Sequence, residues 1–315
     1  MDSASGSDET AYPIESPSTD KPLAPGLYLV ATPIGNLEDI TLRALRVLRS
    51  VDRIACEDTR QTAKLLGHFG IRTPTVSYHT HNETARSSEL IEALQAGGRI
   101  AVVSDAGMPG IADPGATIAT EAIAAGIAVY PIPGANAALS ALIASGLPSE
   151  RFAFHGFLPS KEGQRRSTLE ALRATIAVTI TQATEPTTHI VYETPHRILD
   201  ALADIVAIFG PHQRIVLARE LTKLHEEFLR GTAAELLATL GARTSIRGEM
   251  VLLINGTPAA ALNAAQPQSL AAEVHSQMST QNLSEKEALK QVAKQRGISK
   301  SEAYRELQRT QSHKR

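Results

Sequence analysis

The sequence predicts an α/β protein with a first α/β domain on a parallel sheet, a second α/β domain on a mixed sheet, and a small C-terminal helical extension. Short apolar runs alternate with amphipathic segments between residues 26 and 145, a pattern typical of parallel strands joined by crossover helices. After residue 150, several strand-like runs follow one another with little helix between them, which indicates a mixed sheet. From residue 285 to 315, nine Lys/Arg stand against four Asp/Glu on two segments with helical patterning.

The composition is that of an ordinary globular protein. Of the 315 residues, 43% are hydrophobic and 20% are charged, and the length allows two domains with a small appendage. The apolar runs are shorter than the roughly 18 residues of a membrane span, and the N-terminus lacks the pattern of a secretory signal. We therefore expect a cytoplasmic protein without membrane association.

The cysteine count and the net charge limit the kinds of site that the protein can contain. The single cysteine, Cys56, cannot form an internal disulfide, and no Cys/His spacing predicts a structural metal site. Because the net charge is −2, any nucleic-acid binding has to come from a local cluster of basic residues.

Five segments are expected along the chain. Residues 1–25 are rich in Ser, Thr, Pro and acidic residues, which predicts a disordered tail. An Ala/Pro/Gln-rich stretch after the second domain is typical of a linker. The predicted divisions after the tail are 26–147 for the first domain, 148–256 for the second, 257–269 for the linker and 270–315 for the basic helical extension.

In the first domain, buried strands alternate with helices. The helix over 41–51, for example, places Leu42, Leu45 and Leu48 on one face. Pro114 is expected in the first turn of its helix, a position that proline favours. The predicted strands are 26–32, 53–56, 75–78, 99–103 and 127–130, and the predicted helices are 41–51, 59–67, 83–96, 114–125 and 137–145.

The second domain and the extension follow from the same patterns. In the extension, Ser284 and Ser299 each precede a glutamate by three residues, a capping-box spacing, and Gly297 separates two helices, which predicts a helix-turn-helix-like pair. The predicted strands are 151–157, 188–192, 214–218, 226–230 and 248–254, and the predicted helices are 164–174, 195–209, 233–240, 270–278, 284–295 and 299–309.

Three loops rich in Gly and Pro follow predicted strands, at residues 32–36, 104–115 and 131–136. One such loop could be turn chemistry alone, but three at the carboxyl ends of strands in one sheet favour a ligand site. Glycines allow close backbone approach, and a helix that starts with small residues exposes its backbone N–H groups. The chain has neither a G-x-G-x-x-G nor a P-loop motif, so we expect a neutral or cationic, partly apolar ligand.

Four motifs carry a resemblance to a known family: Val30–Thr41, Glu57–Arg60, Ser104–Gly115 and Pro133–Ala138. Together they resemble the ribosomal RNA small subunit methyltransferase I family, a branch of the tetrapyrrole methylase fold, over about residues 27–254. The resemblance implies S-adenosylmethionine-dependent methylation of a cytidine ribose 2′-hydroxyl in the decoding centre of bacterial 16S rRNA, and a homodimer. The Gly-Pro-Gly-Asp-Pro loop of the wider tetrapyrrole methylases is replaced by Thr32–Asn36, which argues against a corrin or sirohaem substrate.

The resemblance also implies where the cofactor and the substrate bind. S-adenosylmethionine is expected between the two domains, and no metal is expected. Asn36, Arg60 and Arg197 are expected to contact the substrate. The residues expected to contact the cofactor are Pro33, Ser104, Asp105, Met108, Ile111, Asp113, Pro133, Ala135, Ala137, Ala138, Phe157 and Leu158.

A ribose hydroxyl is a weak nucleophile, and a base or hydrogen-bond acceptor contributes roughly 10²–10⁴-fold to rate. Glu193 is the first candidate because it follows a buried strand at the domain junction, although it could instead be a structural partner of Arg197 or of a backbone turn. The other candidates are Asp105, Glu220, His79, His81 and His155.

Two further sets of residues keep alternatives open. The His79-Thr80-His81 stretch with Glu83 could be a metal site, but a solvated loop or an RNA contact is favoured, because methyl transfer from this cofactor needs no metal. Four basic side chains are either RNA-phosphate contacts or part of a solvated face: Lys161, Arg165, Arg166 and Arg197.

Two other functions remain open at the level of sequence. A methylase of a small tetrapyrrole has the same fold and cofactor but gives no role to the basic extension. A non-enzymatic rRNA-binding assembly factor explains the extension but leaves the three loops without a ligand. The expected partner is therefore 16S rRNA or the small ribosomal subunit, bound through the basic extension.

Overall fold

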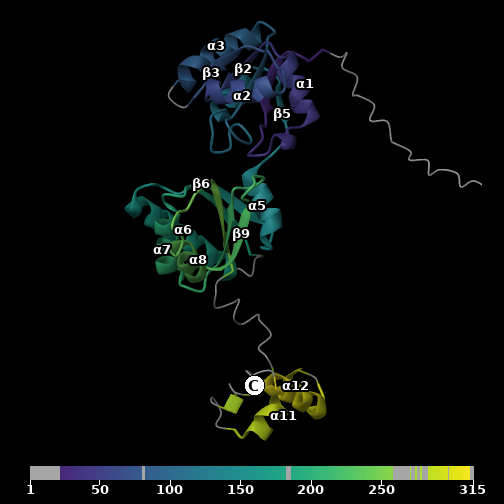
Figure 1. Cartoon of the computed structure of the whole chain (residues 1–315), viewed down its shortest axis with the longest axis vertical. Coiled ribbons are helices and arrows are strands. Elements are labelled where there is room, and N and C mark those ends of the chain that lie inside the picture. Colours follow the sequence, from purple (N-terminus) through teal and green to yellow (C-terminus); the bar gives the residue numbers. More distant parts are fainter. Residues whose placement is uncertain are drawn as a thin grey trace, which may run out of the picture.

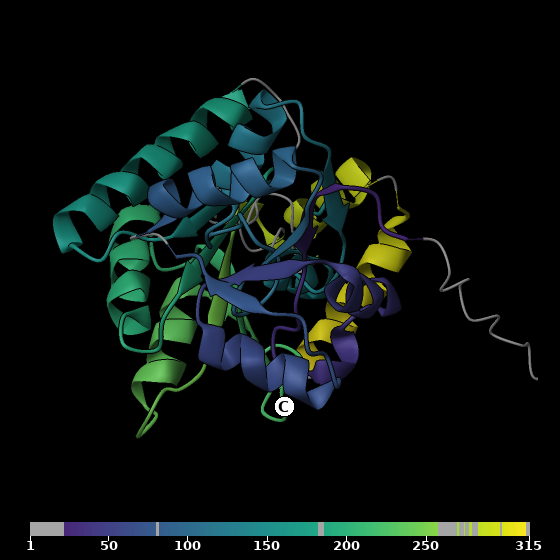
Figure 2. The same cartoon turned by 90° about the horizontal axis from the view of Figure 1, so that it is seen from above.

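Two five-stranded sheets follow one another along the chain, and a separate helical pair lies beyond them (Figure 1). The computed structural model describes residues 22–79, 82–181, 186–257, 270, 274, 277–278, 283–296 and 298–312. Most of the expected tail and linker, together with Thr80, His81 and Gly297, lies outside the described residues. Seen from above, helices surround the strands of the two sheets (Figure 2).

The first sheet is entirely parallel, as predicted, with strand order β3-β2-β4-β1-β5. Because β1 and β4 are neighbours, the loops that follow them leave the same edge of the sheet side by side. The strands are β1 (Gly26–Val30), β2 (Arg53–Cys56), β3 (Thr75–Ser77), β4 (Arg99–Val103) and β5 (Val129–Ile132).

Helices cover both faces of this sheet. On one face, α1 and α2 bury residues such as Val47 and Leu66 against Ile54. On the other face, α3 and α4 bury Leu90 and Ile118. The helices are α1 (Leu42–Ser50), α2 (Thr59–His68), α3 (Glu83–Gln95) and α4 (Ala116–Ala124), and a short 3₁₀ helix, η1 (Leu37–Asp39), precedes α1.

β1 ends at Val30, two residues before its predicted end, and two other elements begin two residues later than predicted. β5 covers Val129–Ile132, two residues later than predicted, and includes Pro131. A proline is tolerated there because β5 is the edge strand and pairs only with β1. α4 begins at Ala116 and leaves Pro114 outside, because Gly115 at φ 134° is its N-cap and the Pro114 carbonyl accepts the Gly110 N–H at 3.1 Å.

The second sheet is mixed, as predicted, with strand order β6-β7-β10-β8-β9. Only β6 and β7 are parallel, and the other pairs are antiparallel. Its strands are β6 (Phe152–Phe157), β7 (Thr188–Glu193), β8 (Arg214–Arg219), β9 (Glu227–Thr232) and β10 (Met250–Asn255).

Different helices pack on the two faces of the second sheet. The helices α6 (Glu162–Thr181), α7 (Ile198–Phe209) and α8 (Ala233–Gly241) enclose one large apolar cluster. The other face is covered by α5 (Ala137–Ser145), whose Ala141 and Leu142 pack against strand residues, and Ile34 of the first domain joins this cluster. By packing, α5 therefore belongs with the second sheet, although the chain runs into it directly from β5.

The C-terminal extension has a small core of its own. Helices α11 (Glu285–Arg296) and α12 (Lys300–Ser312) pack together around Leu289, Val292 and Leu307. Both capping glutamates are in place, because Glu287 accepts the Ser284 N–H at 3.1 Å and Glu302 accepts the Ser299 N–H at 3.0 Å. The two predicted helices are thus confirmed. No helix among the described residues is long and apolar enough to cross a membrane.

Candidate active site

A cavity of about 400 Å³ lies between the two sheets and is lined by residues of both domains. The first domain contributes the loops after β1, β2 and β4 together with the start of α5, and the second contributes the ends of β6 and β7 and the residues around β8 and β10. Its lining residues are Ile34, Glu57, Asp105, Ala106, Gly107, Met108, Ile111, Ala112, Asp113, Asn136, Ala137, Phe157, Tyr192, Glu193, Thr194, Pro195, Leu221, Glu249, Met250 and Val251.

The loops after β1 and β4 are tied to each other at the cavity. Thr32 and Gly107 exchange two backbone hydrogen bonds, at 2.9 and 3.1 Å, and the Thr32 hydroxyl donates to the Ser104 carbonyl at 3.1 Å. Gly107 has φ 86°, and a Cβ there would lie 3.3 Å from Cγ2 of Ile34. The glycine therefore permits a left-handed backbone and keeps this wall of the cavity free of a side chain.

The start of α5 forms a second wall of backbone. The Asn136 side chain accepts the Leu139 N–H at 3.0 Å and caps the helix, while Asn136 and Ala137 line the cavity. A helix N-terminus with small residues presents backbone N–H groups to a negatively charged group of a ligand. The sequence predicted this helix start at the correct residue.

Five carboxylates line the cavity, and none of the described lining residues is Lys, Arg or His. Burial, followed by the nearby charges of Glu57 and Asp105, raises the pKa of Asp113 to about 6. Burial and Asp105 also raise the pKa of Glu57, against a lowering effect of His79. Asp105 accepts the Asp58 N–H at 3.2 Å. The cavity is consequently a site for a ligand with positive charge.

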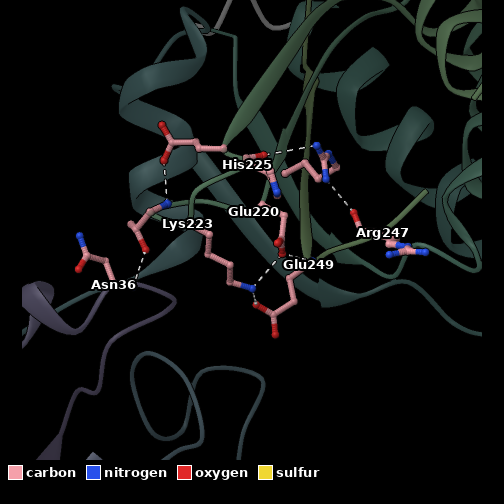
Figure 3. Close-up of polar contacts among 9 residues, drawn as sticks. Asn36, Glu220, Lys223, His225, Arg247 and Glu249 are labelled. Atoms are coloured by element: carbon pink, nitrogen blue, oxygen red, sulfur yellow. Dashed lines mark hydrogen bonds and ion pairs between the residues drawn. The ribbon is translucent and has the colours of Figure 1, made fainter. Parts of the chain in front are cut away.

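The loop between β8 and β9 contributes Leu221 to the cavity lining, and its polar contacts are drawn in Figure 3. Lys223 donates to Glu220 at 2.9 Å and to Glu249 at 3.0 Å, so that one lysine holds two carboxylates. Glu220 and Thr222 have positive φ, 54° and 64°, which is uncommon for residues with side chains. From this loop, the sequence analysis named only Glu220, as a candidate base, and Glu220 does not line the cavity. It missed Leu221, which does, because no motif distinguishes the loop from an ordinary turn.

The same loop links the two domains. The Asn36 N–H donates to the Thr222 hydroxyl at 3.1 Å, and the Asn36 side chain accepts the Glu38 N–H at 3.1 Å to cap η1. Asn36, which was expected to contact the substrate, thus holds the first loop against the second domain. It does not line the cavity.

Glu193 lines the cavity, and its carboxylate is already engaged. The residue is 2% exposed, and its Oε1 accepts the Thr194 N–H at 2.8 Å and lies 3.2 Å from Arg197 Nε. Burial raises its pKa, against the effects of Thr194 and Arg197. These contacts are those of the structural alternative considered for Glu193, and its role as a base stays a prediction.

The cavity brings together half of the residues expected to bind the cofactor. Ser104 is buried behind the wall, where its hydroxyl donates to the Gly107 carbonyl at 3.1 Å. The expected residues that line the cavity are Asp105, Met108, Ile111, Asp113, Ala137 and Phe157. Those that do not line it are Pro33, Ser104, Pro133, Ala135, Ala138 and Leu158.

Several basic residues have structural partners. Arg60 pairs with Asp58 at 2.8 Å outside the cavity, and Arg197 donates to the Leu158 carbonyl as well as to Glu193. Arg165 is 4% exposed and pairs with Asp204 at 2.7 Å, so both readings of it, RNA contact and solvated face, are wrong. The apolar spacing of α6 could not reveal that α7 brings an aspartate to it.

The histidines lie apart from the cavity lining. His155 and His189 form a ring-nitrogen contact of 3.0 Å on β6 and β7, and burial lowers the pKa of both. His79 is described but does not line the cavity, and His81 lies outside the described residues. Among the described residues, no group of three or more His, Cys, Asp and Glu has a metal-binding arrangement.

Comparisons with known proteins agree with this architecture. Residues 26–237 match the family model described as Tetrapyrrole (Corrin/Porphyrin) Methylases. Among solved structures, the chain is similar to a conserved hypothetical protein of Aeropyrum pernix K1 (TM-score 0.57, 20% identity, 78% of this chain and 92% of that chain). It is also similar to a diphthine synthase (TM-score 0.55, 16% identity, 72% of this chain and 89% of that chain). Both likenesses show the fold.

Curated relatives carry one name. A protein of Halalkalibacterium halodurans named "Ribosomal RNA small subunit methyltransferase I" is 49% identical over 88% of this chain and 93% of its own length. The protein of the same name from Bacillus subtilis is 43% identical over 88% of this chain and 92% of its own length. That from Escherichia coli O157:H7 is 50% identical over 73% of this chain and 77% of its own length. The chain belongs to the ribosomal RNA small subunit methyltransferase I family, which has the tetrapyrrole methylase fold, and is an S-adenosylmethionine-dependent methyltransferase.

Proposed function

We propose that the protein methylates ribosomal RNA of the small subunit and that the acceptor is a cytidine ribose 2′-hydroxyl in the decoding centre of 16S rRNA. The names of relatives at 43–50% identity support the RNA substrate. The observation that carries the proposal is the cavity between the domains, to which all four motifs that resemble that family supply lining residues. The motif that begins at Val30, for example, supplies Ile34.

The residues of the cavity fit the methyl donor. S-adenosylmethionine carries a sulfonium, an ammonium and a carboxylate on a short aliphatic chain, joined through a ribose to an adenine ring. The carboxylates of Asp105 and Asp113 suit the cationic groups, and the N-terminus of α5 suits the carboxylate. Ile34, Leu221 and Val251 supply apolar walls. When bound, the donor supplies an electrophilic methyl group.

The chain itself has to orient the acceptor hydroxyl, exclude water and accept a proton. Two carboxylates are candidates for the proton acceptor. Glu193 is the one expected first, and its Oε2 contacts Arg197 at 3.3 Å. Asp105 also lines the cavity and accepts an N–H from Asp58. We propose Glu193 as the acceptor and Asp105 as the alternative.

Two isosteric variants separate these candidates. If Glu193 takes the proton, Glu193→Gln lowers kcat by about 10²–10⁴-fold while S-adenosylmethionine affinity changes little. Asp105→Asn then keeps most of kcat. The reverse pattern assigns the proton to Asp105, and loss of folding in Glu193→Gln, seen by thermal denaturation, supports its structural role with Arg197.

The basic extension is proposed to attach the enzyme to rRNA. Lys286, Lys290 and Lys294 are exposed and recur at four-residue spacing along α11, which places them on one face of the helix. Exposed Lys300 and Arg305 on α12 add to the same basic block. Such a surface gains affinity for RNA by releasing counterions from the phosphates.

We also propose a homodimer. The apolar side chains of Ile143 on α5 and of Phe152 on the edge strand β6 are 80% and 46% exposed. A two-fold assembly that buried them would remove an exposed edge and an apolar face together. Sedimentation at micromolar concentration tests this, and a monomeric mass contradicts it.

Mapping of methylated riboses tests the function as a whole. In 16S rRNA from a strain that lacks the gene, one 2′-O-methylcytidine of the decoding centre is expected to be absent, and the plasmid-borne gene restores it. Unchanged rRNA methylation combined with calorimetric binding of a free tetrapyrrole would favour the tetrapyrrole alternative. Failure to bind S-adenosylmethionine would favour a non-enzymatic assembly factor.

A further inference from the structure

The carboxylates of the cavity are not equally compensated. Glu193 lies 3.2 Å from the Arg197 guanidinium, and Glu249 lies 3.0 Å from the Lys223 ammonium. Lys223 is itself shared with Glu220, which lies outside the lining (Figure 3). The charge of Glu193 is therefore compensated, and that of Glu249, which shares its lysine with Glu220, is compensated in part.

The other three carboxylates, those of Glu57, Asp105 and Asp113, form one uncompensated wall. They come from the ends of β2 and β4 and from the loop before α4, all in the first domain. Among the described residues, the hydrogen-bonding partners of this wall are neutral groups, namely the Ser104 side chain at Asp113 and the Asp58 N–H at Asp105. His79 affects Glu57 from nearby, but as an imidazole it is not a permanent cation.

We propose that Glu57, Asp105 and Asp113 make the cavity select the methyl donor, which has a positive charge on sulfur, over its thioether product, which has none there, so that the loss of this charge on methyl transfer promotes product release. On transfer, the methyl carbon leaves sulfur for the acceptor oxygen, and the electron pair of the broken C–S bond stays on sulfur. The acceptor hydroxyl gives up its proton. The ligand therefore loses one unit of positive charge while its shape changes by a single methyl group.

The magnitude follows from elementary electrostatics. In a site partly removed from water, removal of one carboxylate facing a cation changes affinity by about tenfold, which corresponds to about one pKa unit of interaction. S-adenosylhomocysteine keeps the ammonium of the donor but has no charge on sulfur, so a carboxylate that faces the sulfur interacts with it there only through weak dipolar terms. The ratio of the dissociation constants of S-adenosylhomocysteine and S-adenosylmethionine therefore measures the effect, independently of turnover.

The selectivity is expected to depend on pH through Asp113. The groups that face it are Glu57 from β2, Asp105 from β4, Glu249 before β10, and the Ser104 hydroxyl. Tyr192 on β7 is also near, because Asp113 contributes to raising its pKa. Since the pKa of Asp113 is raised to about 6, a cation that binds beside it favours the ionised form and releases a proton near that pH.

The proposal rests on the proposed function in one respect, which is that the donor binds in this cavity. Calorimetry with three ligands tests both statements on the full-length protein: S-adenosylmethionine, S-adenosylhomocysteine, and sinefungin, an analogue with an amine in place of the sulfonium. The variants are Asp113→Asn, Glu57→Gln and Asp105→Asn. The matched control is Glu92→Gln on the exposed side of α3, outside the cavity lining.

We expect each cavity variant to weaken S-adenosylmethionine and sinefungin about tenfold, to change S-adenosylhomocysteine by less than about threefold, and to leave the control unchanged. In buffers of different ionisation enthalpy, wild type is expected to release protons on S-adenosylmethionine binding at pH 6, and Asp113→Asn less. If all three ligands weaken equally, the cavity holds the donor but charge selection is wrong. If none of the three variants changes the affinity for any of the three ligands, the donor does not bind in this cavity, and both the placement of the donor and the proposed charge selection are wrong.

Discussion

The cavity and the C-terminal extension carry opposite charge, and this contrast organises the molecule. The cavity is lined by five carboxylates, with no Lys, Arg or His among its described lining residues. The extension instead exposes a row of lysines on α11. The net charge of −2 conceals this separation, because the two regions nearly cancel in the sum. Under the proposed function, this separation directs the small cationic ligand and the polyanionic RNA to different parts of one chain.

The two regions also differ in how they are built. The cavity depends on contacts between residues far apart in the chain, such as the bridge from Thr32 to Gly107. The extension is held by contacts between neighbouring helices, around residues such as Leu289 and Leu307. A change in the cavity is therefore expected to affect ligand binding steeply, whereas charge changes on the extension act gradually and add up.

The largest effect is expected for Gly107→Val. The residue has φ 86°, and its Cβ would lie 3.3 Å from Ile34 Cγ2, so the substitution strains the backbone and places a branched side chain in the cavity. We expect S-adenosylmethionine affinity to fall by at least about 100-fold in calorimetry. Gly163→Val on α6, where a Cβ meets nothing within 4 Å, is the control. Unchanged affinity in both Gly107→Val and a second variant, Ala137→Leu, would contradict the site.

The next largest effect is expected for the basic C-terminal extension. Replacing Lys286, Lys290 and Lys294 together by Gln removes three exposed cations from one face of α11. The plot of log affinity for rRNA against log salt has a negative slope, and its steepness is then expected to decrease by about 2–3, at roughly 0.7–0.9 per phosphate contact. Binding of S-adenosylmethionine is expected to stay the same.

Removal of residues 270–315 extends this test. It is expected to flatten the salt dependence further, again with no change in donor binding. An unchanged slope in both proteins would move the RNA surface to the first domain, around Arg43, Arg60 and Lys64. Loss of donor binding on truncation would make the extension a part of the core fold.

A smaller effect is expected on stability. The pKa of Asp113 is about 6 in the folded protein against 3.8 ordinarily, so the folded state holds this proton more tightly. The carboxyl therefore costs stability as pH rises from about 4 to 6, and Asp113→Asn should remove that cost. Because the group is partly exposed, we expect a gain of only about 1 kcal/mol at pH 7.5. Urea unfolding without ligand measures it; an equal gain at pH 4 would contradict the titration.

The smallest effect is expected for Lys223→Met. Its loss leaves Glu249 uncompensated beside the cavity, which should raise the preference for S-adenosylmethionine over S-adenosylhomocysteine by about two- to threefold. Lys223 also lowers the pKa of Glu220, an interaction that stabilises the fold at neutral pH and is lost as the pH falls through that lowered pKa. The control is Lys64→Met, because the Lys64 ammonium lies outside the cavity and donates to the Gln61 side chain at 3.0 Å. An unchanged ligand preference would mean that Glu249 does not face the donor.

By itself, the sequence determined the parallel and mixed sheets, most helix boundaries and the loops that form the cavity. Such features follow from short-range patterns: burial repeats with the period of a strand or helix, and Asn136 or Ser299 caps a helix within three residues of itself. In the motif from Ser104 to Gly115, the glycines likewise stand at the positions where the turns require a positive φ angle.

Only the tertiary structure decided which carboxylates of the cavity are paired with a cation and which are left to interact with a ligand. Glu193 has a possible partner four residues along the chain, Arg197, and the fold forms that pair. Asp113 precedes a predicted helix, and nothing local shows that the fold places Glu57, from the end of another strand, beside it together with Asp105. Because the interaction of two charges depends on their distance and burial, and the fold sets both between residues far apart in the chain, the electrostatics of the site emerges only when the two domains are assembled.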